Sequence, residues 1–319
     1  MHAASLIMLS WAMIGAACFV SPASTSLMAG VLAVMVAVVG LPHGAADHRF
    51  ARPRLEPVLG SAWAGVFLVS YLLVAAAVVC GWLVAPAATI VLFFLASAWH
   101  FGQEEPRFAI GPRALRPAFR FARGGLVIWV PVVFQTDAVL RILTIAAPRG
   151  FEADIQRAVA AITACAWPLL TLAVVGWGWQ CLAAVSATGR TRRVLALDSA
   201  VTASMAVLFA TAHPLVSFLV YFCGWHSVRG LSRLRRELGE TWSQLVVSVA
   251  PMTIAAIGLI AVAAVVGLRA PTLGDTLIRV TFVGLSAVAV PHVLLHGAAT
   301  LFERLGNLRI TPVQLGSSA

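Results

Sequence analysis

The stretch LMAGVLAVMVAVVGLPHGAADHRF, residues 27–50, joins a long apolar run directly to two histidines and a carboxylate. The run is of the kind that spans a membrane, for which a helix needs about twenty apolar residues. His43, Asp47 and His48 lie where the run ends. A helix that only had to stop needs a single glycine or charged residue. The histidines and the aspartate therefore call for a chemical explanation.

The composition of the whole chain assigns it to the membrane proteins. Of the 319 residues, 61% are hydrophobic and 11% are charged, whereas soluble domains are about 25% charged. The five cysteines lie in apolar runs without CxxC spacing, so neither a disulfide framework nor a zinc site is indicated. We expect an all-α polytopic membrane protein in which residues 1–319 form a single bundle of about 8–10 transmembrane helices.

Apolar runs give the approximate positions of these helices. The run at 124–146 contains Gln135, Asp137 and Arg141, which leaves it open to a break into two pieces. The expected spans are 6–20, 26–43, 62–84, 87–101, 124–146, 158–183, 195–211, 214–228, 245–268 and 278–301.

The connections between these spans differ in charge. Arginines gather in the connections at 44–61, 102–123, 184–194 and 229–244, and the alternate connections are short or balanced in charge. Because basic loops stay on the cytoplasmic side, we expect a multi-pass inner-membrane protein with both termini in the cytoplasm. No soluble segment is long enough to bind nucleic acid. The expected surroundings of the basic segments are membrane lipids.

Five histidines fall at a similar depth on the side that the arginines mark as cytoplasmic. His43, His100 and His226 end three of the spans, and His292 and His296 lie in the last span, one helical turn apart. Ionisable groups inside a membrane bundle are costly and mark functional sites. Imidazoles from several helices favour a transition metal such as iron, copper, zinc or nickel. A single histidine at a helix end is otherwise explained by the helix dipole.

Two carboxylates accompany the histidines and are the candidate catalytic residues. Asp47 follows His43 by four residues and could orient its ring by accepting the proton of the nitrogen that does not bind metal. Glu104, with Glu105, could do the same for His100. The plainer alternatives are that Asp47 pairs with Arg49 and that the two glutamates are solvated partners of Arg107.

Three segments, GLPHGAADH, WHFGQEE and YFCGWHSVRG, resemble motifs of the Brp/Blh family of membrane β-carotene 15,15'-dioxygenases, in order from about residue 40 to 236. The resemblance implies Fe(2+) as cofactor, O2 as co-substrate and a lipid-soluble carotenoid that is split at its central double bond into two retinals. It implies His43, His100 and His226 as iron ligands. It also suggests that retinal is handed over to a rhodopsin.

The sequence departs from the family's third motif at Gly230, where the motif has a second histidine four residues after the first. Three explanations are open: His292 or His296 takes its place, water fills the position, or activity is altered or lost. The substrate should also meet a flat apolar tunnel. We expect Trp99 and Trp225, each next to an implied ligand, to line it.

Two other classes of protein remain as alternatives. A diiron desaturase or hydroxylase would need more histidine boxes than the single HxxxH of this chain. A histidine-lined transporter or channel without enzymatic activity would need polar residues along a path through the membrane. An oxygenase that acts on another carotenoid or lipid is a third reading.

Overall fold

The computed structural model describes residues 11–12, 25–104, 111–266 and 270–309, and within these ranges it contains helices and no strand. The all-α class is therefore confirmed. The first half comprises α2 (Thr25–Met35), η1 (Val36–Gly40), α3 (Leu41–Ala45), α4 (Asp47–Leu59), η2 (Gly60–Ala62), α5 (Trp63–Val84), α6 (Pro86–Glu104), η3 (Arg113–Leu115), α7 (Arg116–Gly124), α8 (Leu126–Phe134) and α9 (Thr136–Ala146). The second half comprises α10 (Glu152–Ser186), α11 (Gly189–Thr211), α12 (Pro214–Leu219), η4 (Val220–Ser227), α13 (Val228–Glu237), α14 (Trp242–Val266) and α15 (Leu273–Arg309).

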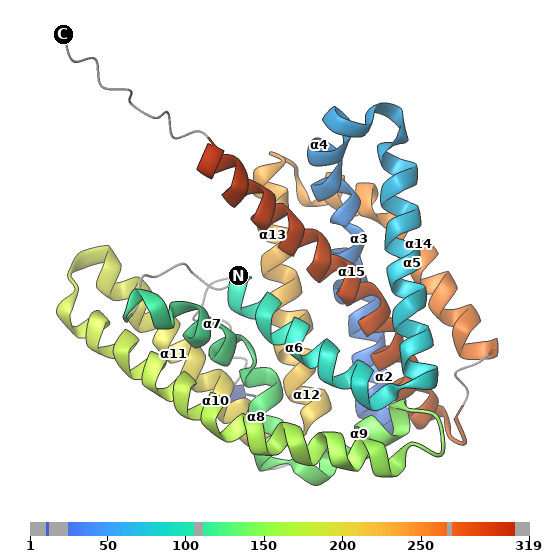
Figure 1. Ribbon diagram of the computed structural model, residues 1–319, viewed down its shortest axis with the longest axis horizontal. Helices are drawn as coiled ribbons and strands as arrows, with labels where there is room; N and C mark the ends of the chain where they lie inside the picture. Colours follow the sequence, from blue (N-terminus) through green and yellow to red (C-terminus); the bar gives the residue numbers. More distant parts are fainter. Residues whose placement is uncertain (1–10, 13–24, 105–110, 267–269, 310–319) are drawn as a thin grey trace.

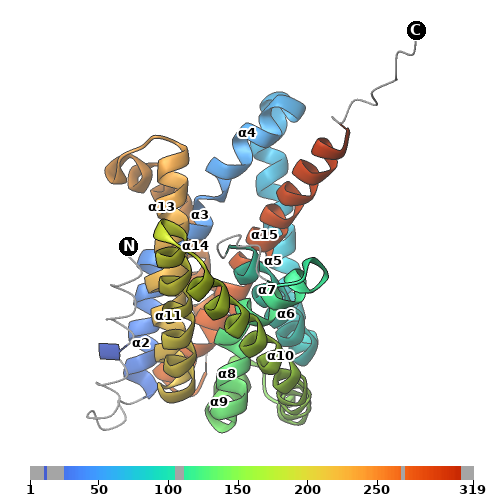
Figure 2. The same cartoon turned by 90° about the vertical axis from the view of Figure 1, so that its left-hand side faces the viewer.

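Two groups of helices flank a central one. The helices α2, α5, α14 and α15 form one side of the bundle, and α10 and α11 lie obliquely across the other (Figure 1). Between them run α6, α8 and α12 (Figure 1). The long α15 contacts α2, α5, α6 and α9, so it connects most of these elements. At one end of the molecule lie α4, α13 and the C-terminal part of α15, with α9 at the other end (Figure 2).

Among the described residues, fewer helices are long and apolar enough to cross a membrane than the eight to ten expected. Five are long and apolar enough, or six if the bent pair α7–α8 counts as one span. The count is lower because one continuous segment, Thr25–Val84, contains two expected spans, and α12 is short. The expected span 124–146 does break at Gln135, between α8 and α9. The span expected at 6–20 lies almost wholly outside the described residues. The protein is an all-α polytopic membrane protein.

Arginine-rich segments that we expected to be loops are largely helical. The segments in question are α4, α7 and α13, which carry ten arginines between them. Arginine is a good helix former, and helices with a polar face lie well in a membrane interface. As a consequence His43 and His226 do not end their helices, because the chain continues into α4 and α13.

A buried ion pair ties α7, α10 and α11 together. The guanidinium of Arg123 donates to both carboxylate oxygens of Asp198, at 2.8 Å each, and Gln180 donates to the same carboxylate at 2.5 Å. The side chains of Arg123 and Asp198 are 19% and 9% exposed. The pair stabilises the side of the bundle against which α6 packs.

Replacing Asp198 with alanine should destabilise the fold by up to about 3–5 kcal/mol, because the largely buried guanidinium of Arg123 loses the carboxylate that accepts two of its hydrogen bonds. The measurement is the free energy of unfolding in detergent micelles. Glu56→Ala is the control, since it removes the exposed pair between Arg52 and Glu56 and should cause no measurable change. Equal losses in the two variants would contradict a structural role for the buried pair.

Candidate metal centre

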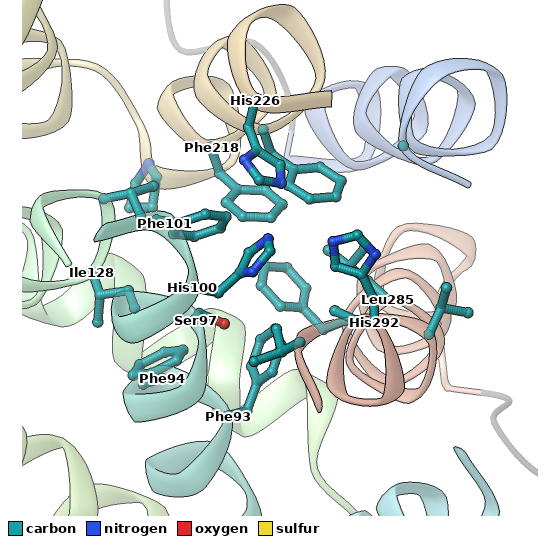
Figure 3. Close-up of a pocket in the computed structure, with 18 of the residues that line it drawn as sticks. Phe93, Phe94, Ser97, His100, Phe101, Ile128, Phe218, His226, Leu285 and His292 are labelled. Atoms are coloured by element: carbon teal, nitrogen blue, oxygen red, sulfur yellow. The ribbon is translucent and has the colours of Figure 1, made fainter. Parts of the chain in front are cut away.

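Four imidazole rings from four parts of the chain meet inside the bundle. His43 lies 5.0 Å from His226 and 4.9 Å from His292, measured between ring centroids. His100 lies 5.3 Å from His226 and 4.8 Å from His292. Figure 3 shows His100, His226 and His292 pointing from three helices toward one space. The fifth ring, His296, lies 4.4 Å from His292, on the side of α4.

Local departures from regular helix geometry lie beside three of these rings. His43 follows the π-helical turn η1 and Pro42, His226 lies within the π-helical segment η4, and His292 follows Pro291 inside α15. Single π-helical turns occur often at functional sites, since the extra residue per turn changes the direction of the side chains. A proline inside a helix removes a hydrogen bond and bends it. These three rings therefore point inward at positions where the backbone is irregular, whereas His100 lies in the regular helix α6.

The donor atoms fit a transition metal. The ligand nitrogens of His43, His226 and His292 all lie within 4.8 Å of one another. Ligands about 2.1 Å from one ion are at most about 4.2 Å apart, so the rings are near the separation at which they bind. The Nε2 atoms of His43 and His100 are buried without a hydrogen-bond partner among the described residues. Such atoms are costly unless a ligand satisfies them, and imidazole suits iron.

Asp47 holds the outer edge of the cluster. Its carboxylate accepts a hydrogen bond from Nδ1 of His292 at 2.7 Å and lies 3.4 Å from Nε2 of His296. The hydroxyl of Tyr71 on α5 lies 3.2 Å from the same carboxylate and 2.8 Å from the carbonyl of Val288. A carboxylate on the second nitrogen of a ring fixes its orientation and the position of its proton. Asp47 therefore positions His292.

The structure changes two expectations about Asp47 and does not test the one about Glu104. Asp47 hydrogen-bonds to His292, whereas we expected it to orient His43. Its alternative partner, Arg49, pairs with Glu240 of the α13–α14 turn. The side chain of Glu104, like Glu105, lies outside the described residues. Tyr71 was missed from the sequence, although it is one of two tyrosines in the chain and lies in an apolar run.

An apolar cavity of about 110 Å³ opens onto the rings. His43, His100, His226 and His292 lie in its wall, and apart from them Ser97 is the one polar side chain among the described lining residues. Six phenylalanines line it, and Figure 3 shows Phe93, Phe94, Phe101 and Phe218 around His100. Such a wall favours an apolar ligand.

A family model described as beta-carotene 15,15'-dioxygenase matches residues 33–298. The chain belongs to this family. It is 28% identical over 272 residues to a beta-carotene 15,15'-dioxygenase from an uncultured marine bacterium 66A03, covering 82% of this chain and 90% of that protein. It is also 28% identical over 300 residues to the probable beta-carotene 15,15'-dioxygenase Blh of Halobacterium salinarum, covering 86% of this chain and 84% of that protein. No solved structure matches.

In this member of the beta-carotene 15,15'-dioxygenase family, tryptophans do not form the apolar cavity. Trp99 is 45% exposed, and Trp225 lines a separate small pocket beside Arg123 and stacks under Arg229. The expectation was wrong because neighbouring residues on a helix point about 100° apart. A residue next to an inward-pointing histidine faces a different side. Phenylalanines line the cavity in their place.

Gly230 lies directly under the ring of His43. A Cβ atom at residue 230 would be 2.2 Å from Cε1 of His43 and 2.7 Å from its Nδ1. Any larger residue at 230, a histidine included, would collide with His43 as it lies here. The structure thus brings His292 into the cluster and leaves no room for a side chain at 230.

Gly230→Ala should displace His43 and lower metal affinity by about 10–100-fold, the range seen when the support of a ligand is lost. Overpacking should also cost about 1–3 kcal/mol of stability, partly offset by about 1 kcal/mol of helix propensity. The measurements are metal content after dialysis and the unfolding free energy.

Gly258→Ala is the matched control, because Gly258 is also in a helix and a Cβ there meets no atom within 4 Å. It should keep the wild-type metal content. Wild-type metal content in Gly230→Ala would show that His43 does not bind in the position described.

Proposed function

We propose that the chain cleaves β-carotene at its central double bond into two retinals, using O2 and a histidine-bound ferrous iron. Membership of the family supports the reaction. The observation that supports a metal site is the meeting of four imidazoles at the wall of an apolar cavity. A chain that only buried histidines for packing would not collect them at one point.

We assign the iron to His43, His100, His226 and His292, so that His292 takes the place left by Gly230. The closeness of His292 to His43 and His226 supports this choice over His296, which faces Asp47 and stacks on Phe50. A non-haem ferrous iron with vacant positions supplies the activation of dioxygen. Asp47 acts as a positioning residue for His292.

The reaction balances without a further reductant. The O–O bond and the central C=C bond break, two C=O bonds form, and each retinal receives one oxygen atom. The protein must therefore align the polyene with the site and exclude water from it. The phenylalanine-lined cavity suits both tasks, because aromatic faces stack on a flat conjugated chain.

The proposed location is the inner membrane, with the arginine-rich α4 and α13 on the cytoplasmic side and both termini in the cytoplasm. The distribution of arginine supports this orientation. A carotenoid would reach the apolar cavity from the bilayer core. The retinal product would pass to a retinal-binding protein such as a rhodopsin.

A transporter is less well supported. An ion path needs polar groups along its length, and the cavity on the phenylalanine side of the histidines is lined mainly by phenylalanine, leucine, isoleucine and valine. Cleavage of a lipid-soluble substrate is the function that such a wall favours.

The main test uses the purified protein in detergent with ferrous iron, O2 and β-carotene. Wild type should bind one iron per chain and release two retinals per β-carotene. Alanine at His43, His100, His226 or His292 should lower both the affinity for iron and the rate of retinal formation. The loss should exceed the roughly 10–100-fold that is typical when a residue supporting a metal ligand is replaced. His213→Ala is the control, because His213 only caps α12. Full activity in His292→Ala would contradict its role.

Narrowing the cavity should separate substrate binding from metal binding. Ala289→Phe adds a ring to the cavity wall of α15 and should abolish retinal formation while iron content stays at the wild-type level. Leu294→Phe, on an exposed part of the same helix, should change neither. Normal cleavage by Ala289→Phe would mean that the carotenoid binds elsewhere.

A further inference from the structure

A second cavity meets the histidine cluster on the side opposite the phenylalanines. It measures about 140 Å³ and lies between α4, α13 and α15, at the end of the molecule where these helices meet (Figure 2). We call it the polar chamber. Its charged and imidazole side chains are His43, Asp47, Arg54, Arg233, Glu237, His292 and His296.

His43 and His292 line both cavities, so they form the partition between them. A hydrated divalent cation cannot cross the apolar cavity cheaply, because its phenylalanines and aliphatic side chains offer no ligands to replace water. The polar chamber offers such groups. An ion that reaches the histidines from water therefore has one suitable side of approach among the described residues.

The polar chamber contains a second set of candidate metal ligands, which differ in their exposure to solvent. Ligand atoms of Asp47, His292 and His296 lie within 4.8 Å of one another. The side chain of His296 is 26% exposed, whereas those of His292 and Asp47 are 7% and 3% exposed. Exposure thus falls from His296 toward the cluster.

The outer lining residues reach the surface. Arg54 and Glu237 are exposed residues of α4 and α13. The two arginines of the polar chamber, Arg54 and Arg233, are balanced in formal charge by Asp47 and Glu237. The polar chamber is therefore neutral overall and does not repel a cation by net charge.

We propose that the polar chamber is the route by which the metal ion enters, with His296 and Asp47 as its first protein ligands before it passes to His43, His100, His226 and His292. This inference rests on the proposed function, because it needs a metal at the cluster. It gives His296 a role that is separate from the final site. Asp47 then has two roles, as a transfer ligand and as the partner of His292.

The test follows metal uptake and needs no turnover. Metal-free full-length protein in detergent is mixed with Co(2+), and the visible absorption of the bound ion is followed by stopped flow. His296→Ala should take up cobalt measurably more slowly than the wild type and still reach one ion per chain. Leu234→Trp, which fills the polar chamber from α13 without removing a ligand, should slow uptake in the same way.

Two controls should load at the wild-type rate. His48→Ala removes a nearby histidine that bonds to the carbonyl of Ala45, and Ala289→Phe narrows the apolar cavity. Wild-type rates in both His296→Ala and Leu234→Trp would overturn the proposed route, as would slow uptake in Ala289→Phe. A second bound cobalt that disappears in His296→Ala would make this a resident site and overturn transfer. No uptake by the wild type would overturn the proposed function as well.

Discussion

Imidazole rings buried in an apolar bundle need partners for their ring nitrogens, a constraint that governs the helices around them. A buried polar atom without a partner costs about 1–3 kcal/mol, and Nε2 of His43 and of His100 have none among the described residues. One metal ion can satisfy several rings at once. We infer that α3, α6, η4 and α15 are held in their mutual positions by this shared ligand as well as by apolar packing.

The irregular backbone around the site follows from the same constraint. In a regular helix about one residue per turn faces a given point. Because the cluster brings rings from four elements to one depth, each ring has to lie at the right height and face the same point. The π-helical turn before His43, the π-helical segment that contains His226, and Pro291 before His292 redirect the chain at those places. Gly230 then lets the His43 ring lie against α13. Apolar and polar cavities meet at the rings because His43 and His292 face both.

The sequence predicts the membrane class and the gathering of five histidines at one depth, since apolar runs and arginine-rich connections set the depth of each motif. It does not predict which groups touch. Asp47 lies one turn from His43 in sequence, yet its bond is to His292, 245 residues away. Trp99 follows the motif pattern but faces outward, and Tyr71 carries no motif at all. Such partners are set by the rotation and bending of packed helices, which periodicity does not encode.

The most direct test of the four-histidine site is X-ray absorption at the iron edge of the loaded protein, comparing wild type with His292→Ala and His296→Ala. We expect imidazole scattering from four ligands in the wild type, one fewer in His292→Ala and no change in His296→Ala. An unchanged spectrum in His292→Ala, or a site dominated by carboxylate or sulfur ligands, would contradict the claim that these four histidines hold the metal.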